Sequence, residues 1–218
     1  MKSRFELPIV AALSVALAAT TQAHAAEQWG IGTRAGIAIS GGKPANDIEH
    51  TGLFGTYALS PGSRVGISAD WLVYDFEGPW AVVGVQQDTA ITPKIIDAKV
   101  KSTLVSAFYE QNYGARTERW NWNWRAGLGF AKPKAPNVSG PATGGGTFTM
   151  STDAGTETVL SGGASVRYNV SPSVSFDLGG TLRHHRAKWK ITDTVSGRTG
   201  TVKSYSSIGV EAGLGIRF

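Results

Sequence analysis

Polar and small residues, some of them charged, alternate with apolar residues in several strand-like stretches of this 218-residue chain. In 120–130, for example, asparagine, arginine and glycine alternate with large apolar residues, so charged and small residues share one face. Carboxylates and guanidinium groups that face one enclosed space can pair, transfer protons or line a solute path. The candidates for such a network are Arg34, Asp70, Glu110, Arg125, Asp177 and Glu211.

A second candidate is the basic run over 183–190, which also contains His184 and His185. Arginine and lysine hold phosphate groups through charge-assisted hydrogen bonds. Adjacent histidines on a strand point to opposite faces, so these two cannot share a metal ion. We expect no catalytic, cofactor or metal site, because the chain has no cysteine and Gly144–Gly146 is not followed by a lysine and a helix. The cations that could contact phosphate are Arg183, Arg186, Lys188 and Lys190.

Eight stretches of alternating polarity must position these residues. The connections between them are short at 60–63, 114–118 and 169–172, and long at 41–50, 77–96, 132–156 and 191–201. Alternating short and long connections are typical of an up-and-down barrel with tight turns at one end. The sequence therefore predicts an all-β fold, an eight-stranded antiparallel up-and-down transmembrane β-barrel. The expected strands lie in 28–40, 51–60, 64–76, 97–113, 119–131, 157–169, a stretch starting at Ser173, and 202–218.

The distribution of polarity indicates a membrane rather than water outside the barrel. A soluble barrel has an apolar interior, whereas the charged faces here are also rich in glycine and serine, as a narrow polar interior requires. The opposite faces are apolar and would form a large sticky patch in water. Aromatic residues that suit a membrane interface are expected near one end of the strands. They are Trp29, Tyr57, Trp120, Tyr168 and Phe218.

The first 25 residues have the features of a secretory signal peptide. A basic start with Lys2 and Arg4 precedes an apolar run over 9–19, and the segment closes with Ala23-His24-Ala25. We expect cleavage after Ala25, which leaves 26–218 as one barrel domain. The chain has no run of 18 apolar residues, so the sequence predicts no transmembrane helix.

The chain resembles the small eight-stranded outer-membrane barrels, the OmpA transmembrane domain and OmpX type. The resemblance extends from Gln28-Trp29-Gly30 to the final Gly213-Leu214-Gly215-Ile216-Arg217-Phe218, and the strand ending in Phe218 is its specific part. It implies export to the outer membrane of a Gram-negative bacterium and recognition of Phe218 by the barrel-assembly machinery. It also implies a monomer among outer-membrane lipid and lipopolysaccharide, with no nucleic-acid partner.

The sequence is compatible with three functions. The first is a structural or loop-mediated interaction role, such as adhesion at the cell surface, with an extracellular ligand bound by loops 77–96 and 132–156 and a polar, plugged lumen. Within that lumen we expect Arg34 to pair with Glu211, and Arg125 with Asp70 and Asp177. The alternatives are a narrow solute pore and a lipid A-modifying enzyme. The deacylase type of such enzymes has Ser two residues after its His, whereas Arg186 and Ala187 stand there in this chain.

Overall fold

The computed structural model describes residues 28–40, 45–76, 99–114, 118–141, 147–195 and 197–218. The expected signal peptide, the loop 77–96 and the possible hairpin at 80–88 lie outside these ranges. Among the described residues, no helix has the length and apolar character needed to span a membrane.

Eight of the described strands close into an antiparallel barrel, as the sequence predicts, in the order β1-β12-β9-β8-β5-β4-β3-β2. Hydrogen bonding between β1 and β12 closes the barrel over eleven residue pairs, from Gly30↔Arg217 to Ser40↔Ser207. The barrel strands are β1 (Trp29–Ser40), β2 (Ala45–Ala58), β3 (Ser63–Phe76), β4 (Lys99–Tyr113), β5 (Trp120–Lys134), β8 (Glu157–Asn169), β9 (Val174–Arg186) and β12 (Tyr205–Arg217).

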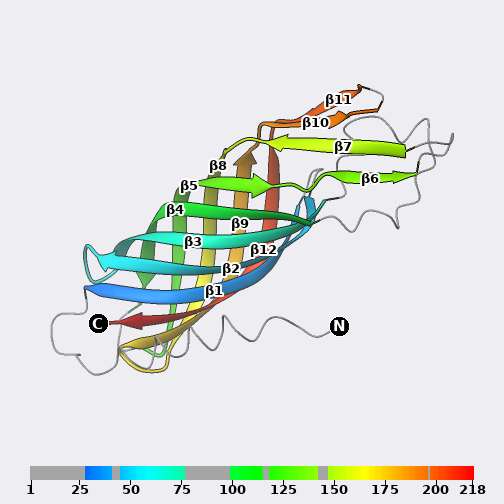
Figure 1. Cartoon of the computed structure of the whole chain (residues 1–218). Helices are drawn as coiled ribbons and strands as arrows, with labels where there is room; N and C mark the ends of the chain where they lie inside the picture. Colours follow the sequence, from blue (N-terminus) through cyan, green and yellow to red (C-terminus); the bar gives the residue numbers. More distant parts are fainter. Residues whose placement is uncertain (1–27, 41–44, 77–98, 115–117, 142–146, 196) are drawn as a thin grey trace.

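Four further described strands continue one side of the barrel as a second sheet, which we call the extension. They are β6 (Val138–Pro141), β7 (Thr147–Ala154), β10 (Trp189–Asp193) and β11 (Thr199–Val202), in the order β11-β10-β7-β6. Figure 1 shows the extension beyond one end of the barrel, with the C-terminus at the other end. The prediction of long loops at 132–156 and 191–201 is therefore wrong for most of these residues, and β2 begins at Ala45 within the expected loop 41–50.

The barrel end that carries Trp29, Phe218 and the tight turns is here called the turn end. Ser60 and Ser63 hydrogen-bond each other through their backbones there, and Ser171 and Val174 do the same. Aromatic pairs stand on the outer wall at this end. Trp29 and Tyr57 have ring centroids 4.9 Å apart, and Trp120 and Tyr168 have theirs 4.8 Å apart. The predicted clustering of aromatic residues near this end is confirmed.

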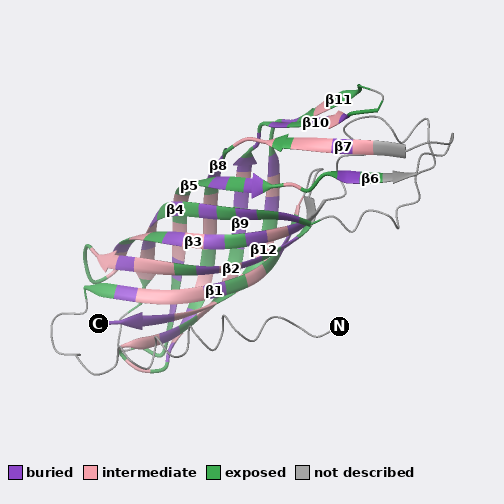
Figure 2. Cartoon of the chain, viewed as in Figure 1, coloured by how far each residue is buried: buried purple, intermediate pink, exposed green. Residues whose placement is uncertain are grey.

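Side chains alternate between the two faces of the barrel wall, as Figure 2 shows in the banding of buried and exposed residues along each strand. On β5, Trp122, Leu128 and Phe130 are exposed on the outer face, while Asn121 and Asn123 are buried on the inner face. The predicted assignment of faces is correct for this strand. Inside the barrel, polar residues fill the part nearer the turn end.

The interior is apolar nearer the extension, contrary to the expectation of a polar lumen throughout. A continuous buried cluster links barrel residues such as Leu72, Tyr74 and Val159 with extension residues such as Trp189 and Ile191. The outer face becomes polar at the same level, where Phe130 is followed on β5 by the exposed Lys132 and Lys134. Near the turn end the barrel is therefore polar inside and apolar outside. Near the extension it is apolar inside and polar outside, as in a soluble protein.

Candidate functional site

The first charged group inside the barrel joins β1 to β3. Arg34 donates from Nε to Asp70 Oδ1 at 2.7 Å and from Nη2 to Asp70 Oδ2 at 2.6 Å, so both carboxylate oxygens are used. The same Nη2 reaches Ser68 Oγ at 2.9 Å, and Ser68 donates to Asp70 at 3.1 Å. Asp70 is fully buried. A paired, two-point geometry of this kind offsets the cost of burying both charges.

A glycine on the intervening strand makes this ion pair possible. Gly52 of β2 stands opposite Arg34 on one side and opposite Asp70 on the other. A Cβ at position 52 would lie 2.1 Å from Asp70 Oδ1, closer than any side chain allows. The two charged side chains therefore meet over a strand position that must have no side chain.

The second charged group lies at the turn end. Arg167 and Asp177 are direct partners across β8 and β9, and Arg167 Nε donates to Asp177 Oδ1 at 2.8 Å. Arg167 Nη2 also reaches Glu110 Oε1 across the lumen at 3.0 Å, while Asn123 donates to Asp177 at 3.1 Å. One guanidinium group thus holds two carboxylates from opposite sides.

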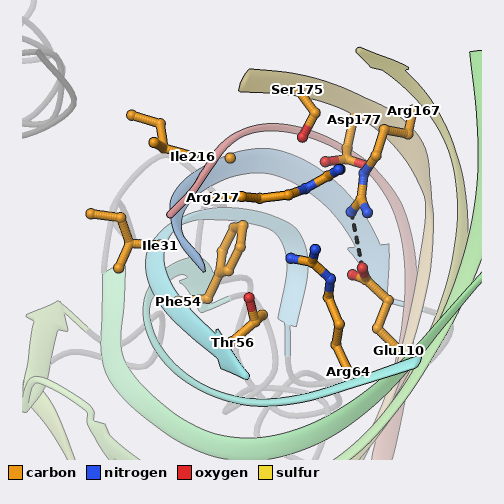
Figure 3. A pocket seen from close by; sticks show the side chains of 11 residues that line it. Ile31, Phe54, Thr56, Arg64, Glu110, Arg167, Ser175, Asp177, Ile216 and Arg217 are labelled. Carbon is orange, nitrogen blue, oxygen red and sulfur yellow. Dashed lines mark hydrogen bonds and ion pairs between the residues drawn. The ribbon is translucent and has the colours of Figure 1, made fainter. Parts of the chain in front are cut away.

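A small cavity adjoins this second group. Figure 3 shows Arg64, Arg167 and Arg217 directed into it together with Glu110. The cavity measures about 20 Å³, which is room for a single water molecule. Side chains rather than an aqueous channel therefore occupy the lumen at this end.

The third charged group lies near the middle of the barrel around Glu211. Arg125 donates to Glu211 Oε1, His50 Nε2 lies 3.4 Å from Oε2, and Arg183 Nη2 lies 3.8 Å from the same oxygen. Among the described residues, several buried polar atoms here have no hydrogen-bond partner. They are Nδ1 and Nε2 of His50, Nη1 of Arg183 and Oε2 of Glu211.

All six residues of the predicted network face the interior, but the predicted pairs are wrong. Arg34 pairs with Asp70 rather than with Glu211, because the register of β1 and β12 places Gly213 opposite Arg34. Arg125 pairs with Glu211 across the barrel, while Asp70 and Asp177 are held by Arg34 and Arg167. The six residues therefore form three separate groups, each completed by residues outside the predicted set.

A fourth polar site, buried in the apolar part of the interior, was not predicted. The fully buried carboxylate of Glu157 accepts hydrogen bonds from Trp189 Nε1 at 2.5 Å and Tyr205 OH at 3.2 Å, and it contacts His185 Nδ1 at 2.9 Å. The His185 and Tyr205 rings stack with centroids 4.4 Å apart. The site ties β8, β10, β12 and the end of β9 together. The inward position of Glu157 in the alternation was the signal that could have found it.

The structure divides the predicted phosphate-contacting residues between two faces. Arg183 is buried inside the barrel beside Glu211, so the expectation that it contacts lipopolysaccharide is wrong for this residue. Arg186, Lys188 and Lys190 are exposed on the outer face. Alternation along β9 explains the division, because residues 183 and 186 have opposite parity.

The outer wall also brings a histidine and a serine together. His184 Nδ1 lies 2.9 Å from Ser206 Oγ on the neighbouring strand β12. In a nucleophilic triad a third group, commonly a carboxylate, orients the base. No described carboxylate is hydrogen-bonded to His184. The pair was invisible in the sequence because its members are 22 positions apart.

The closed eight-stranded barrel with a charged interior defines a class, the small outer-membrane barrels, and this chain has their fold. OprG from Pseudomonas aeruginosa is similar with a TM-score of 0.57, 15% identity, and coverage of 89% of this chain and 97% of OprG. Neisserial surface protein A has a TM-score of 0.54 and 16% identity, covering 87% and 97%. AlkL, determined in lipid bilayers, has a TM-score of 0.52 and 12% identity, covering 92% and 94%. No protein-family model and no curated protein sequence matches this chain.

Proposed function

We propose that this chain is an outer-membrane barrel with a sealed lumen that acts at the cell surface through its extension. In this proposal the turn end faces the periplasm and the extension faces the exterior. The role is an interaction or adhesion role, without catalysis. Export by the first 25 residues and recognition of Phe218 by the assembly machinery belong to the same proposal.

The filled interior carries the argument against transport. Arg167 bridges Glu110 and Asp177 across the lumen at the turn end, and Arg34 and Asp70 close a second layer above. Beyond these layers the interior is an apolar cluster that continues into the extension. Passage of a solute would require both a break in buried ion pairs and a break in a packed core, and each is costly.

The extension supplies a surface suited to binding. Its inner face is buried through Met150, Trp189 and Ile191, which pack in the same apolar cluster as the barrel interior and so hold the sheet in place. Its outer face is hydrophilic and rich in hydroxyl groups, with exposed or half-exposed serine and threonine side chains. These are Ser139, Thr149, Ser151, Thr192, Thr199 and Thr201. Polar segments on a rigid barrel are typical positions for recognition.

Planar-bilayer conductance together with surface binding tests this proposal. The purified wild-type protein should give only rare and small conductance events. A variant in which 135–154 and 189–202 are replaced by short linkers should keep the heat-dependent gel shift of a folded barrel and lose adhesion of whole cells to host or abiotic surfaces. Steady wild-type conductance would contradict the sealed lumen, and unchanged adhesion would contradict the role of the extension.

A narrow pore is the second candidate, supported by the partnerless polar atoms around Glu211. Buried polar groups without protein partners are ordinarily satisfied by water. A hydrated layer at His50, Arg183 and Glu211 would leave the ion-paired turn end and the apolar cluster as the two barriers to a solute. Steady conductance that Leu104→Ala increases would favour this candidate, because Leu104 belongs to that cluster.

A further inference from the structure

Five cations stand on the outer wall where the apolar band ends. We call Lys101 of β4, Lys132 and Lys134 of β5, and Arg186 and Lys188 at the end of β9 the rim cluster. All five are exposed. The first four lie on β4, β5 and β9, where β8 alone separates β5 from β9, and Lys188 lies two residues beyond the end of β9.

The strand register places the rim cluster directly beyond the apolar residues of the outer wall. Lys132 follows Phe130 on the same face of β5, and a step of two residues along a strand is ~6.6 Å. Phe130 is paired with Thr158 of β8, and Thr158 is paired in turn with Arg186. Arg186 is therefore in the same hydrogen-bonded row as the last apolar residue of β5, Lys132 lies one step farther along β5, and Lys188 lies two residues beyond Arg186. Lipid headgroups meet the hydrocarbon where the outward apolar residues of a barrel end.

Within the rim cluster, positive charges face each other without an intervening acid. Lys101 and Lys134 are direct partners across β4 and β5, an arrangement that destabilises a sheet by itself. Among the described residues, no ion pair joins any of the five cations to a carboxylate. Lys190, just beyond the cluster, differs because Asp153 is its direct partner on β7.

The exposed acids near the end of the apolar band stand on a strand without these cations. Asp47 and Glu49 of β2 are exposed beside Ile39 and Ile37 of β1, and β3 separates them from Lys101 of β4. Cations are thus concentrated on β4, β5 and β9 rather than spread evenly around the barrel. A uniform excess of lysine for solubility does not explain this segregation.

We propose that the rim cluster binds the phosphate groups of phosphorylated glycolipid in the outer leaflet. The proposal rests on the membrane location given above, and it adds a ligand to the barrel wall. Lysine and arginine can lay their aliphatic parts along the apolar wall while their charged ends reach the headgroup. Thr158, between β5 and β9, adds a hydroxyl donor within the same area. Two strand spacings of ~4.8 Å separate Lys132 from Lys188, so one multiply phosphorylated headgroup can contact both sides.

Native mass spectrometry of the detergent-purified protein, titrated with lipid A and with dephosphorylated lipid A, tests the proposal. The wild-type protein should prefer lipid A. Because each cation near an anionic surface contributes on the order of 1 kcal/mol, K132Q/R186Q should weaken lipid A binding by about thirtyfold. Binding of dephosphorylated lipid should change little. The matched control K190Q/R198Q removes the same charge from exposed positions of the extension farther from the barrel and should keep most of the affinity.

The outcomes that would overturn the proposal are distinct. Equal binding of the two lipids shows that phosphate is not recognised, and an equal loss in the control variant shows a general charge effect. Full competition by inorganic phosphate at concentrations equal to the lipid assigns the cations to a free anion instead. The heat-dependent gel shift verifies that each variant is folded. A wild-type protein that does not insert into lipid would overturn the membrane location itself, which the lipid titration in detergent does not depend on.

Discussion

The barrel interior has two layers with opposite chemistry, although the same strands build both. Near the turn end, Arg34, Asp70 and Arg167 are held by ion pairs, and the outer wall beside them carries leucine, valine and tryptophan. Near the extension, Tyr74 and Trp189 pack in an apolar cluster, and the outer wall carries lysine and threonine. The surroundings outside the wall, lipid or water, determine which face must be apolar.

The polarity of the inner and outer faces is exchanged within a few residues around the end of β9. Leu178 and Leu182 point outward while Asp177 and Arg183 point inward. Just beyond, Arg186 and Lys188 are exposed, and Ala187 and Trp189 are buried. The alternation of buried and exposed residues continues through 187 and 188, which lie between β9 and β10, while the environment of each face changes. The same kind of substitution should therefore change the stability by different amounts in the two layers.

The largest effect is expected from breaking the buried ion pair in the charged layer. Arg34→Met leaves the fully buried Asp70 without its counter-ion, and such changes cost ~3–5 kcal/mol. Urea unfolding in lipid vesicles, followed by tryptophan fluorescence, measures the loss.

The double variant R34M/D70L is the control for this experiment. It removes both charges and should recover a large part of the stability, because no unpaired ion remains. A single variant that costs less than the experimental error would show that water screens this layer, which would favour the pore.

The next largest effect is expected from an added charge on the outer face, which should cost stability in the apolar band of the barrel but not on the extension. Leu178→Arg places a cation in the apolar band, where 67% of the leucine side chain is exposed, and should cost ~2–4 kcal/mol near the membrane midplane. Thr199→Arg places the same charge on the exposed wall of β11 and should change stability by no more than ~0.5 kcal/mol. The same unfolding experiment measures both. Similar costs at both positions would mean that the apolar band is not in lipid.

The sequence was sufficient for the barrel strands and their faces, since alternation such as Trp122-Asn123-Trp124 needs no tertiary information. It failed where the polarity of the two faces is exchanged. Lys132 and Lys134 were assigned to a loop because the expected strand ended with its apolar outer residues, although β5 continues to Lys134. The extension was missed for the same reason.

The pairs Arg34–Asp70 and Arg125–Glu211 could not be predicted because each joins strands that are not neighbours. Arg125 of β5 reaches Glu211 of β12 across two intervening strands in the barrel order. The pairing therefore depends on register and on closure of the barrel. Arg34 and Asp70 also depend on the glycine between them, whose role appears only when three strands are aligned.

A smaller effect is expected from filling that glycine position. Gly52→Ala puts a methyl group against Asp70 Oδ1 and must displace the carboxylate from Arg34, at a cost of ~1–3 kcal/mol. Gly180→Ala on the outer face of β9 is the control, because its Cβ would meet only a backbone oxygen at 3.8 Å. Its stability should equal or slightly exceed that of the wild type. Equal destabilisation by both changes would show that strand glycines matter here for backbone reasons alone.

The smallest effect concerns Glu157, whose carboxylate is buried in the apolar layer. Glu157→Gln keeps the shape and one oxygen acceptor. With the amide oxygen facing Trp189 Nε1, the amide nitrogen can donate to Tyr205 OH and to His185 Nδ1 in its other tautomer. Every contact then has a partner, so the expected loss is only ~1 kcal/mol. Glu157→Ala, in contrast, leaves the buried Trp189 donor unsatisfied and should cost more.

Hydrogen exchange resolved by strand shows where the stability is lost. Strands β7 and β10 should exchange faster in both variants, while β1 and β2 remain protected. Faster exchange throughout the barrel would mean that the extension core and the membrane barrel unfold as one unit, and the two layers would then not be energetically separable.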